Sequence, residues 1–182
     1  SPGADDGRPA GAVPLANPLS SDMNVLRPSL LPGLLESLKH NLSRQNQDVA
    51  LFEVGRVFLH SDDGVGEHRR IGLALTGRRQ PTFWSGADRD ARFDAADLKG
   101  LVEEFLEQYG LRGVGYVRTL EPLPLFVESA AILLGGKLPL GILGQLAPAL
   151  AKRYDLRDPV FLAELDLAQL LLRRNTAKGF KA

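Results

Sequence analysis

Leucines recur at three- and four-residue spacing after residue 29, which predicts an amphipathic helix. Ser29 is placed to cap its first turn, and Pro32 falls inside that turn, where a missing N–H costs little. The apolar stripe consists of Leu31, Leu34, Leu35, Leu38 and Leu42. Such a stripe belongs first of all to the protein's own core, and any exposed part of it is a candidate partner surface.

A second stripe of the same period predicts a helix over residues 94–109, ended by Gly110. Its apolar residues are Leu98, Leu101, Val102, Phe105 and Leu106. Two shorter helices are expected over residues 148–154 and 167–172.

The segments between these helices have the β-branched and aromatic content of strands. Residues 49–59 are apolar at both parities apart from Glu53 and Arg56, so we expect a strand buried on both faces. Gly55 within it indicates a bulge or a close backbone approach. Residues 60–70 are predicted to form a turn, and residues 77–92 a polar loop containing Trp84. Further strands are expected at residues 71–76, 114–119, 129–134, 138–143 and 159–165, with a hairpin turn at residues 135–137.

Strands joined in hairpins, with helices between them, predict an α+β fold with a mainly antiparallel sheet. The first 14 residues and the last nine, 174–182, have linker composition, which leaves residues 15–173 as the ordered domain. Because the chain starts at Ser1 and its only methionine is Met23, we expect it to be a piece of a longer protein. It contains neither an apolar run long enough to cross a membrane nor a signal peptide.

Charge and composition narrow the functional classes. The 182 residues include 22 Lys and Arg against 22 Asp and Glu, which argues against a free-standing nucleic-acid binder. Apolar residues make up 44%, enough for a packed core. The chain has no cysteine, which excludes disulfides, thiolate metal sites and a cysteine nucleophile.

No catalytic motif stands out. His60 and His68 bracket a loop with Asp62, Asp63 and Glu67, but the spacing fits no known metal motif and an exposed hairpin tip is the favoured interpretation. His40 is expected on the surface of the first helix. Neither a GxSxG nucleophile motif nor a glycine-rich phosphate loop is present. We therefore assign no catalytic, cofactor-binding or metal-ligating residue.

Three basic doublets are the remaining candidates: Arg69–Arg70, Arg78–Arg79 and Arg173–Arg174. Arg78–Arg79 lies close in sequence to Phe83 and Trp84, and interleaved cations and aromatic rings can contact RNA. Because the net charge of the chain is zero, three doublets are weak evidence for RNA contact.

Longer motifs indicate a family. Residues 17–58, NPLSSDMNVLRPSLLPGLLESLKHNLSRQNQDVALFEVGRVF, closely resemble the β subunit of bacterial phenylalanyl-tRNA synthetase, in its catalytic-like core. Residues 93–111, FDAADLKGLVEEFLEQYGL, are similar to the family's D-x-K-G helix. Residues 140–171, which begin with LGILGQLAP and end in ELDLAQLL, resemble its closing motif, G-x-L-G-x-L-x-P followed by E-L-D-L. The resemblance covers roughly residues 13–173.

The resemblance implies a class II aminoacyl-tRNA synthetase-like antiparallel sheet flanked by helices, in a domain that has lost catalysis. GRVF at residues 55–58 is similar to the first strand of the second class II motif, but Leu59 stands where an active subunit supplies an arginine for ATP. The third motif, a glycine-rich stretch ending in arginine, is absent near the C-terminal strand. The family implies a cytoplasmic (αβ)₂ complex that charges tRNA with phenylalanine using ATP and magnesium, with no role for membranes or DNA. The fragment itself is expected to bind no cofactor and to pack against the α subunit.

The chain departs from the family pattern at two places. Residues 121–131, EPLPLFVESAA, replace a His-Pro-Gly-Arg-Ser-like stretch, and the helix of the first class II motif is not recognisable in residues 1–14. Two alternatives remain open at this point. One is a tRNA-contacting module that uses the arginine doublets, and the other is an enzyme with its own nucleotide site.

Overall fold

The computed structural model describes residues 13–14, 25–79 and 90–174. Four helices are present in these ranges: α1 (Leu31–Ser43), α2 (Ala95–Gln108), α3 (Pro148–Arg153) and α4 (Leu167–Arg173). The strands are β1 (Val13–Pro14), β2 (Val25–Leu26), β3 (Val49–Ser61), β4 (Gly64–Thr76), β5 (Val114–Arg118), β6 (Phe126–Leu134), β7 (Leu138–Leu146) and β8 (Val160–Asp166).

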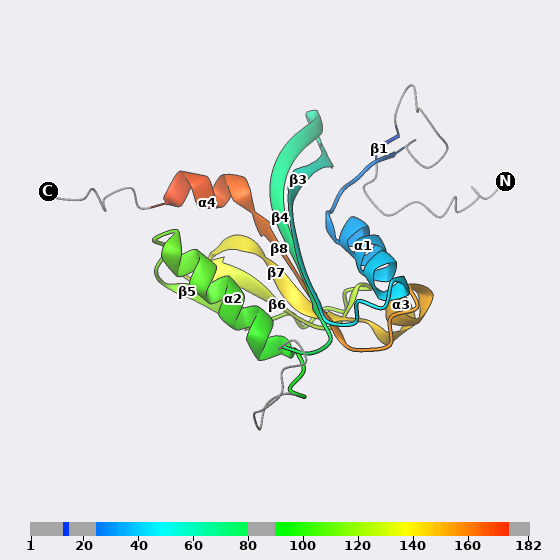
Figure 1. Ribbon diagram of the computed structural model, residues 1–182. Helices are drawn as coiled ribbons and strands as arrows, with labels where there is room; N and C mark the ends of the chain where they lie inside the picture. The colour runs from blue at the N-terminus through cyan, green and yellow to red at the C-terminus, as the bar shows by residue number, and fades with distance from the viewer. Residues whose placement is uncertain (1–12, 15–24, 80–89, 175–182) are drawn as a thin grey trace, which may run out of the picture.

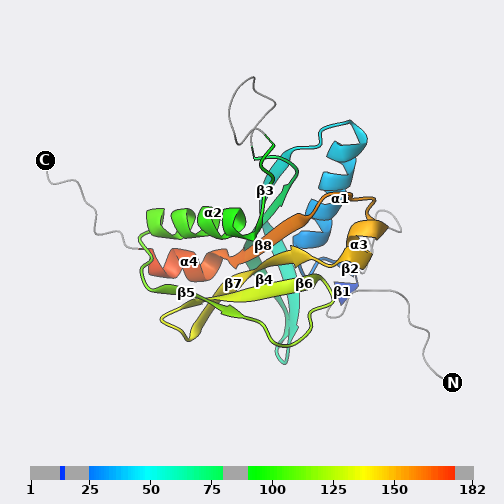
Figure 2. The ribbon, with the colours of Figure 1, turned by 90° about the horizontal axis from the view of Figure 1, so that it is seen from below.

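Six strands form one antiparallel sheet in the order β3-β4-β8-β7-β6-β5, and β1 pairs separately with β2. Helices α1 and α3 cover one face of the sheet, and α2 and α4 cover the other (Figures 1 and 2). We name these the α1 face and the α2 face. The arrangement confirms the predicted α+β fold with an antiparallel sheet.

Each face of the sheet has its own apolar core. On the α1 face the leucine stripe of α1 is buried against β4, β8 and the start of β3. On the α2 face, Leu98, Val102 and Leu106 are at most 1% exposed and pack on β7 and β8. The stripe of the first helix therefore serves the protein's own core, with Leu42 only half-buried at its end.

The first hairpin is longer than predicted. Instead of a turn over residues 60–70, the strands pair without interruption up to Ser61 and Gly64, so the turn contains only Asp62 and Asp63. The polar composition suggested a loop, but backbone hydrogen bonds between strands do not require apolar side chains. The result is a β3–β4 arm that projects from the body of the sheet (Figure 1).

The prediction that the first strand is buried on both faces is wrong. Val49 and Val57, which face α1, are buried, whereas Phe52 is 76% exposed and Val54 50% exposed. The physical reason is position: β3 is an edge strand, while α2 packs on β7 and β8 and α4 on β4. No described element covers the other side of β3.

Helix ends follow the sequence signals closely. Asp94 and Asp97 form a reciprocal capping box at the start of α2, and Gly110 beyond its end adopts a φ of +81°, which glycine accommodates readily. The N-cap of α1 is Leu30 rather than the predicted Ser29, and the helix begins at Leu31. The Ser29 hydroxyl still accepts a hydrogen bond from Leu31 N–H.

Several boundaries shift in the second half of the sheet. Strand β6 begins at Phe126 rather than at residue 129, and β7 continues to Leu146 rather than ending at residue 143. Residues 80–89, including Phe83 and Trp84, lie outside the described residues, as do most of the predicted terminal linkers, so those domain boundaries stay predictions. Among the described helices, none has the length and apolar character needed to cross a membrane.

Candidate interaction surfaces

The start of α1 is held on the sheet by a carboxylate of the central strand. Glu164 on β8 accepts hydrogen bonds from Leu30 N–H at 2.7 Å and from the Ser29 hydroxyl at 2.9 Å. The side chain of the N-cap residue Leu30 cannot cap the helix. Glu164, which is distant in sequence, instead accepts a hydrogen bond from the Leu30 backbone N–H at the start of the helix. Sequence spacing could not indicate this contact, since 134 residues separate the two partners.

Two glycines, one on β3 and one on β4, allow the first residues of α1 to pack directly against these strands. A Cβ atom at Gly55 would lie 2.9 Å from Leu30 Cδ2, and one at Gly72 would lie 2.7 Å from Leu34 Cδ1. The register of β3 with β4 runs without a bulge at Gly55, so the close approach is the correct one of the two predictions for this residue. The α1 face is consequently filled at this place by the protein's own helix.

Ion pairs complete the polar part of the α1 face. Arg27 donates to Glu53 at 2.7 Å and to the Arg56 carbonyl at 2.9 Å. Arg70 lies 3.1 Å from Asp166, and both side chains are at most 20% exposed. The charged groups here are used in contacts between β3, β4, β8 and the segment before α1.

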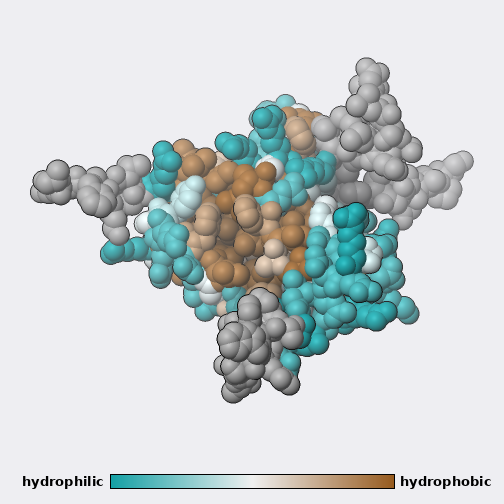
Figure 3. All heavy atoms as spheres, in the orientation of Figure 1, coloured by the Kyte–Doolittle hydropathy of each residue, from teal (hydrophilic) through white to brown (hydrophobic). Residues whose placement is uncertain are grey.

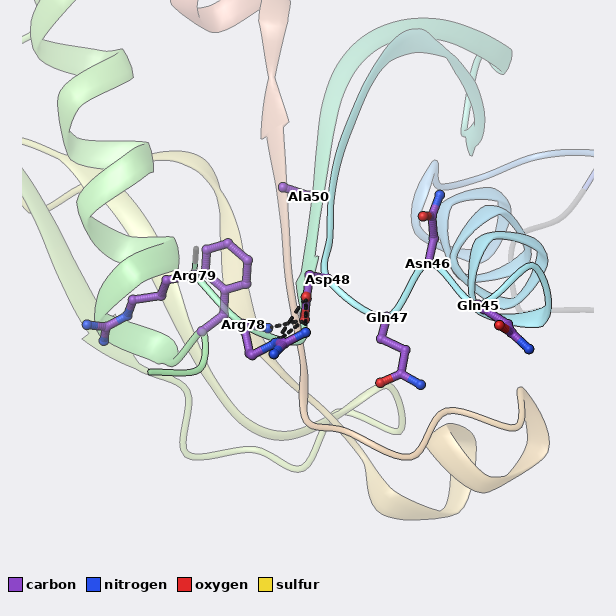
Figure 4. A pocket seen from close by; sticks show the side chains of 8 residues that line it. Gln45, Asn46, Gln47, Asp48, Ala50, Arg78 and Arg79 are labelled. Atoms are coloured by element: carbon purple, nitrogen blue, oxygen red, sulfur yellow. Dashed lines mark hydrogen bonds and ion pairs between the residues drawn. The ribbon is translucent and has the colours of Figure 1, made fainter. Parts of the chain in front are cut away.

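A hollow of about 460 Å³ lies beside the start of β3 and is lined by residues of the loop after α1 (Figure 4). Its centre is an ion pair, in which Arg78 donates to Asp48 from its backbone N–H at 2.7 Å and from its side chain. Burial by itself would raise the pKa of Asp48, but the hydrogen bonds and charge of Arg78 outweigh it and lower the pKa below its ordinary value. The hollow is therefore built around a satisfied pair.

Carboxylates neutralise three of the six arginines in the predicted doublets: Arg70, Arg78 and Arg79. Arg79 binds Asp97 at 2.7 Å and Asp94 at 3.0 Å. The backbone N–H of Asp97 lowers the pKa of Asp94, and the charge of Arg79 adds to this effect. Arg173 donates to Gln169, whereas Arg69 and Arg174 are exposed and form no ion pair with another described residue.

The histidines do not converge. His60 and His68 lie on opposite strands of the β3–β4 arm, where His60 is exposed and pairs in register with Val65, and His40 is exposed on α1. Within the described ranges, no group of three or more His, Asp or Glu side chains is arranged to hold a metal ion.

The most conspicuous surface feature is an apolar strip on β3. It consists of Ala50, Phe52 and Val54, whose side chains alternate onto the α2 face, opposite Leu75, Leu73 and Ile71 of β4. Figure 3 shows apolar residues gathered on this side of the molecule, between the β3–β4 arm and helices α2 and α4. Leu101 of α2 and Leu172 of α4 are also 44% and 77% exposed. An apolar area of this kind is typical of a protein–protein contact.

Solved structures with this architecture show the class of fold. The chain superposes on pyrrolysyl-tRNA synthetase from Desulfitobacterium hafniense with a TM-score of 0.65 at 18% identity, over 89% of this chain and 52% of that one. A second structure of that enzyme matches with a TM-score of 0.63 at 21% identity, over 86% of this chain and 52% of the other. The fold is that of a class II-like aminoacyl-tRNA synthetase catalytic domain.

Within this class, residues 3–167 match the family described as the phenylalanyl tRNA synthetase beta chain CLM domain, and the chain belongs to that family. The phenylalanine–tRNA ligase β subunit of Symbiobacterium thermophilum is 38% identical over 86% of this chain and 18% of its own length. That of Syntrophotalea carbinolica is 36% identical over 98% of this chain and 22% of its own length. The chain thus spans about a fifth of the length of these curated relatives, and the resemblance stated from sequence is confirmed.

Proposed function

We propose that this chain is a non-catalytic structural domain of a phenylalanine–tRNA ligase β subunit, which packs against the α subunit in an (αβ)₂ complex. In that complex the α subunit carries out the ATP- and magnesium-dependent charging of tRNA with phenylalanine in the cytoplasm. The observation that carries the proposal is the apolar strip, in which Phe52 is 76% exposed on an edge strand.

The contacts on the α1 face support a loss of catalysis. Leu30 and Leu34 lie against Gly55 and Gly72, so the side chains of α1 fill the space above these strands. Leu59 follows the GRVF segment, where the family resemblance places an arginine in active subunits. Without a fixed cation, the charge that develops on a nucleotide phosphate would lack electrostatic stabilisation.

The apolar strip supports packing against another protein. A strand edge with exposed apolar side chains and free backbone groups is prone to association unless something covers it. In the described residues, two backbone groups on the outer edge of β3 are paired: Phe58 N–H donates to the Arg27 carbonyl at 2.9 Å, and the Arg56 carbonyl accepts from the Arg27 side chain at 2.9 Å. The edge around Phe52 and Val54 is therefore suited to a partner that supplies apolar side chains.

The proposal is tested by co-purification of the chain with the α subunit of the same ligase, followed by light scattering. We expect a stoichiometric complex from the native chain. The double variant Phe52→Asp with Val54→Asp should weaken association about tenfold or more, because it places two charges in a desolvated contact.

A matched control replaces two exposed valines elsewhere on the sheet, Val117→Asp with Val127→Asp, which are each 53% exposed in the native chain. This variant should retain binding. Circular dichroism should show native secondary structure in both variants. Equal loss of binding in the control, or full binding by the Phe52 and Val54 variant, would contradict the role of the apolar strip.

An enzyme with its own nucleotide site is the competing function. It requires saturable binding of ATP and magnesium by the isolated chain, whereas our proposal expects a flat calorimetric titration. Saturable binding would overturn the non-catalytic assignment without affecting the test of subunit association.

A further inference from the structure

We propose that the end of the molecule where α1 and α3 finish binds the phosphate backbone of RNA. We name this region the basic end and define it by its charged residues. They are the cations Lys39, Arg44, Arg92, Lys152, Arg153 and Arg157, and the carboxylates Asp155 and Asp158. A chain with zero formal net charge thus brings together six cations and two carboxylates in this set, and Asp48, whose carboxylate also interacts with Arg92, is paired with Arg78.

The basic end contains two adjoining hollows that share Asp155 and Arg157. The larger, about 720 Å³, lies between the end of α1 and residues 155–158 and is also lined by Lys39 and Arg92. The smaller, about 580 Å³, lies beside α3 and is lined by Lys152. Figure 1 places the end of α1 beside α3, the ion pair between Lys39 and Asp155 joins α1 to the loop after α3, and Figure 3 shows hydrophilic residues over this part of the surface.

Most cations of the basic end are available to a ligand. Both carboxylates are already paired, Asp155 with Lys39 at 3.7 Å and Asp158 with Arg92 at 2.6 Å. The other four cations are exposed and form no ion pair with another described residue: Arg44, Lys152, Arg153 and Arg157. This contrasts with the doublet arginines Arg70, Arg78 and Arg79, whose charges are matched by nearby carboxylates.

Helix dipoles explain only part of this charge. Cations in the last turn of a helix stabilise its negative end, which accounts for Lys152 and Arg153 in α3. Arg92 and Arg157 belong to no helix. Their presence in the same hollow is not required by helix stability, and it fits a surface that binds an anion.

The neutral side chains of the larger hollow favour RNA among polyanions. Ser43, Gln45 and Gln47 line it and offer hydroxyl and amide groups that can both donate and accept hydrogen bonds. Ribose 2′-hydroxyls and phosphates use such partners together with cations, whereas an acidic peptide offers mainly carboxylates. The choice of RNA over other polyanions also rests on the proposed function in a tRNA ligase.

The test measures binding of the purified chain to a fluorescein-labelled RNA stem-loop by anisotropy over a range of salt concentrations. We expect a dissociation constant of about 10⁻⁴ to 10⁻⁶ M that rises steeply with salt. The triple variant Arg44→Gln, Arg153→Gln and Arg157→Gln should weaken binding about tenfold or more. It should also reduce the slope of log affinity against log salt by roughly two to three, since each lost phosphate contact contributes about 0.7 to 0.9.

The control removes the same net charge from other exposed and unpaired positions: Arg69→Gln, Arg112→Gln and Lys137→Gln. Arg112 and Lys137 follow α2 and β6, at the opposite end of the sheet from α1 and α3 (Figure 2). This variant should bind RNA within about twofold of the native chain. Equal weakening by the control would overturn the proposal, as would absence of RNA binding at low salt or equally tight binding of polyglutamate.

The same triple variant is then assayed for association with the α subunit. Native association together with loss of RNA binding supports the basic end as a separate surface. If the native chain binds the α subunit but not RNA, this inference fails and the proposed function stands. If the native chain binds RNA but not the α subunit, the proposed subunit association fails and this inference stands.

Discussion

The two sides of strand β3 have similar apolar content but differ in burial. Toward α1, Val49 and Val57 are at most 6% exposed, and the strands need glycine at position 72 to admit the helix. Toward α2, Phe52 and Val54 of the same strand are at least 50% exposed. The difference shows that burial here depends on which elements the chain folds over the strand, and we expect the following substitutions to separate the two sides.

The largest effect is expected from truncation on the α1 side. Leu34→Ala should lower the free energy of unfolding by about 2–5 kcal/mol, because Leu34 is 3% exposed and its loss leaves a cavity. Phe52→Ala should change it by no more than about 0.5 kcal/mol, since its side chain already contacts water. Urea unfolding of the two variants measures both values. Comparable losses would mean that the exposed side of β3 is covered in solution.

A methyl group at position 72 tests the close approach of the helix. Gly72→Ala should destabilise the fold by about 1–3 kcal/mol, because the new Cβ would lie 2.7 Å from Leu34 Cδ1. Gly115→Ala on β5 is the matched control, since no atom lies within 4 Å of a Cβ built there. The same urea experiment applies. A neutral Gly72→Ala would indicate that α1 can move away from the sheet without cost.

The smallest effect on stability is expected where β3 begins, at the ion pair between Asp48 and Arg78. The lowered pKa of Asp48 means that its pair with Arg78 stabilises the fold above the ordinary aspartate pKa of 3.8, and that this contribution is lost as the pH falls through the lower native value. Asp48→Asn should therefore reduce the stability difference between pH 7 and pH 3. The expected change is below about 1 kcal/mol, as is usual for partly exposed pairs. An unchanged pH dependence would contradict the assigned role of this pair.

Helices and their ends could be predicted from sequence because their signals are local. The stripes of α1 and α2, the turn chemistry of Gly110 and the position of Pro32 depend on residues within a few positions of one another. The length of the β3–β4 arm could not be predicted in this way. Its outer half is largely polar, and it is held by the backbone pairing of the two strands together with an ion pair between Arg56 and Glu67.

The candidate surfaces were less predictable, because each depends on residues far apart in the chain. The arginine doublets predict cationic sites, but four aspartates neutralise three of their six arginines: Asp48, Asp94, Asp97 and Asp166. The unpaired cations of the basic end come instead from the residue after α1, from α3 and from the loop after α3. No spacing within any one of these segments indicates that they meet.

By itself, the sequence determined the family, the antiparallel α+β class and the apolar stripes of α1 and α2, because long motifs and short-range periodicity are properties of consecutive residues. Only the tertiary structure decided which apolar residues stay uncovered and which charges stay unpaired. Phe52 is exposed because α2 lies over other strands, and Arg157 is unpaired because the nearby carboxylates bind Lys39 and Arg92. Exposure and pairing depend on distances across the fold, which no local pattern encodes.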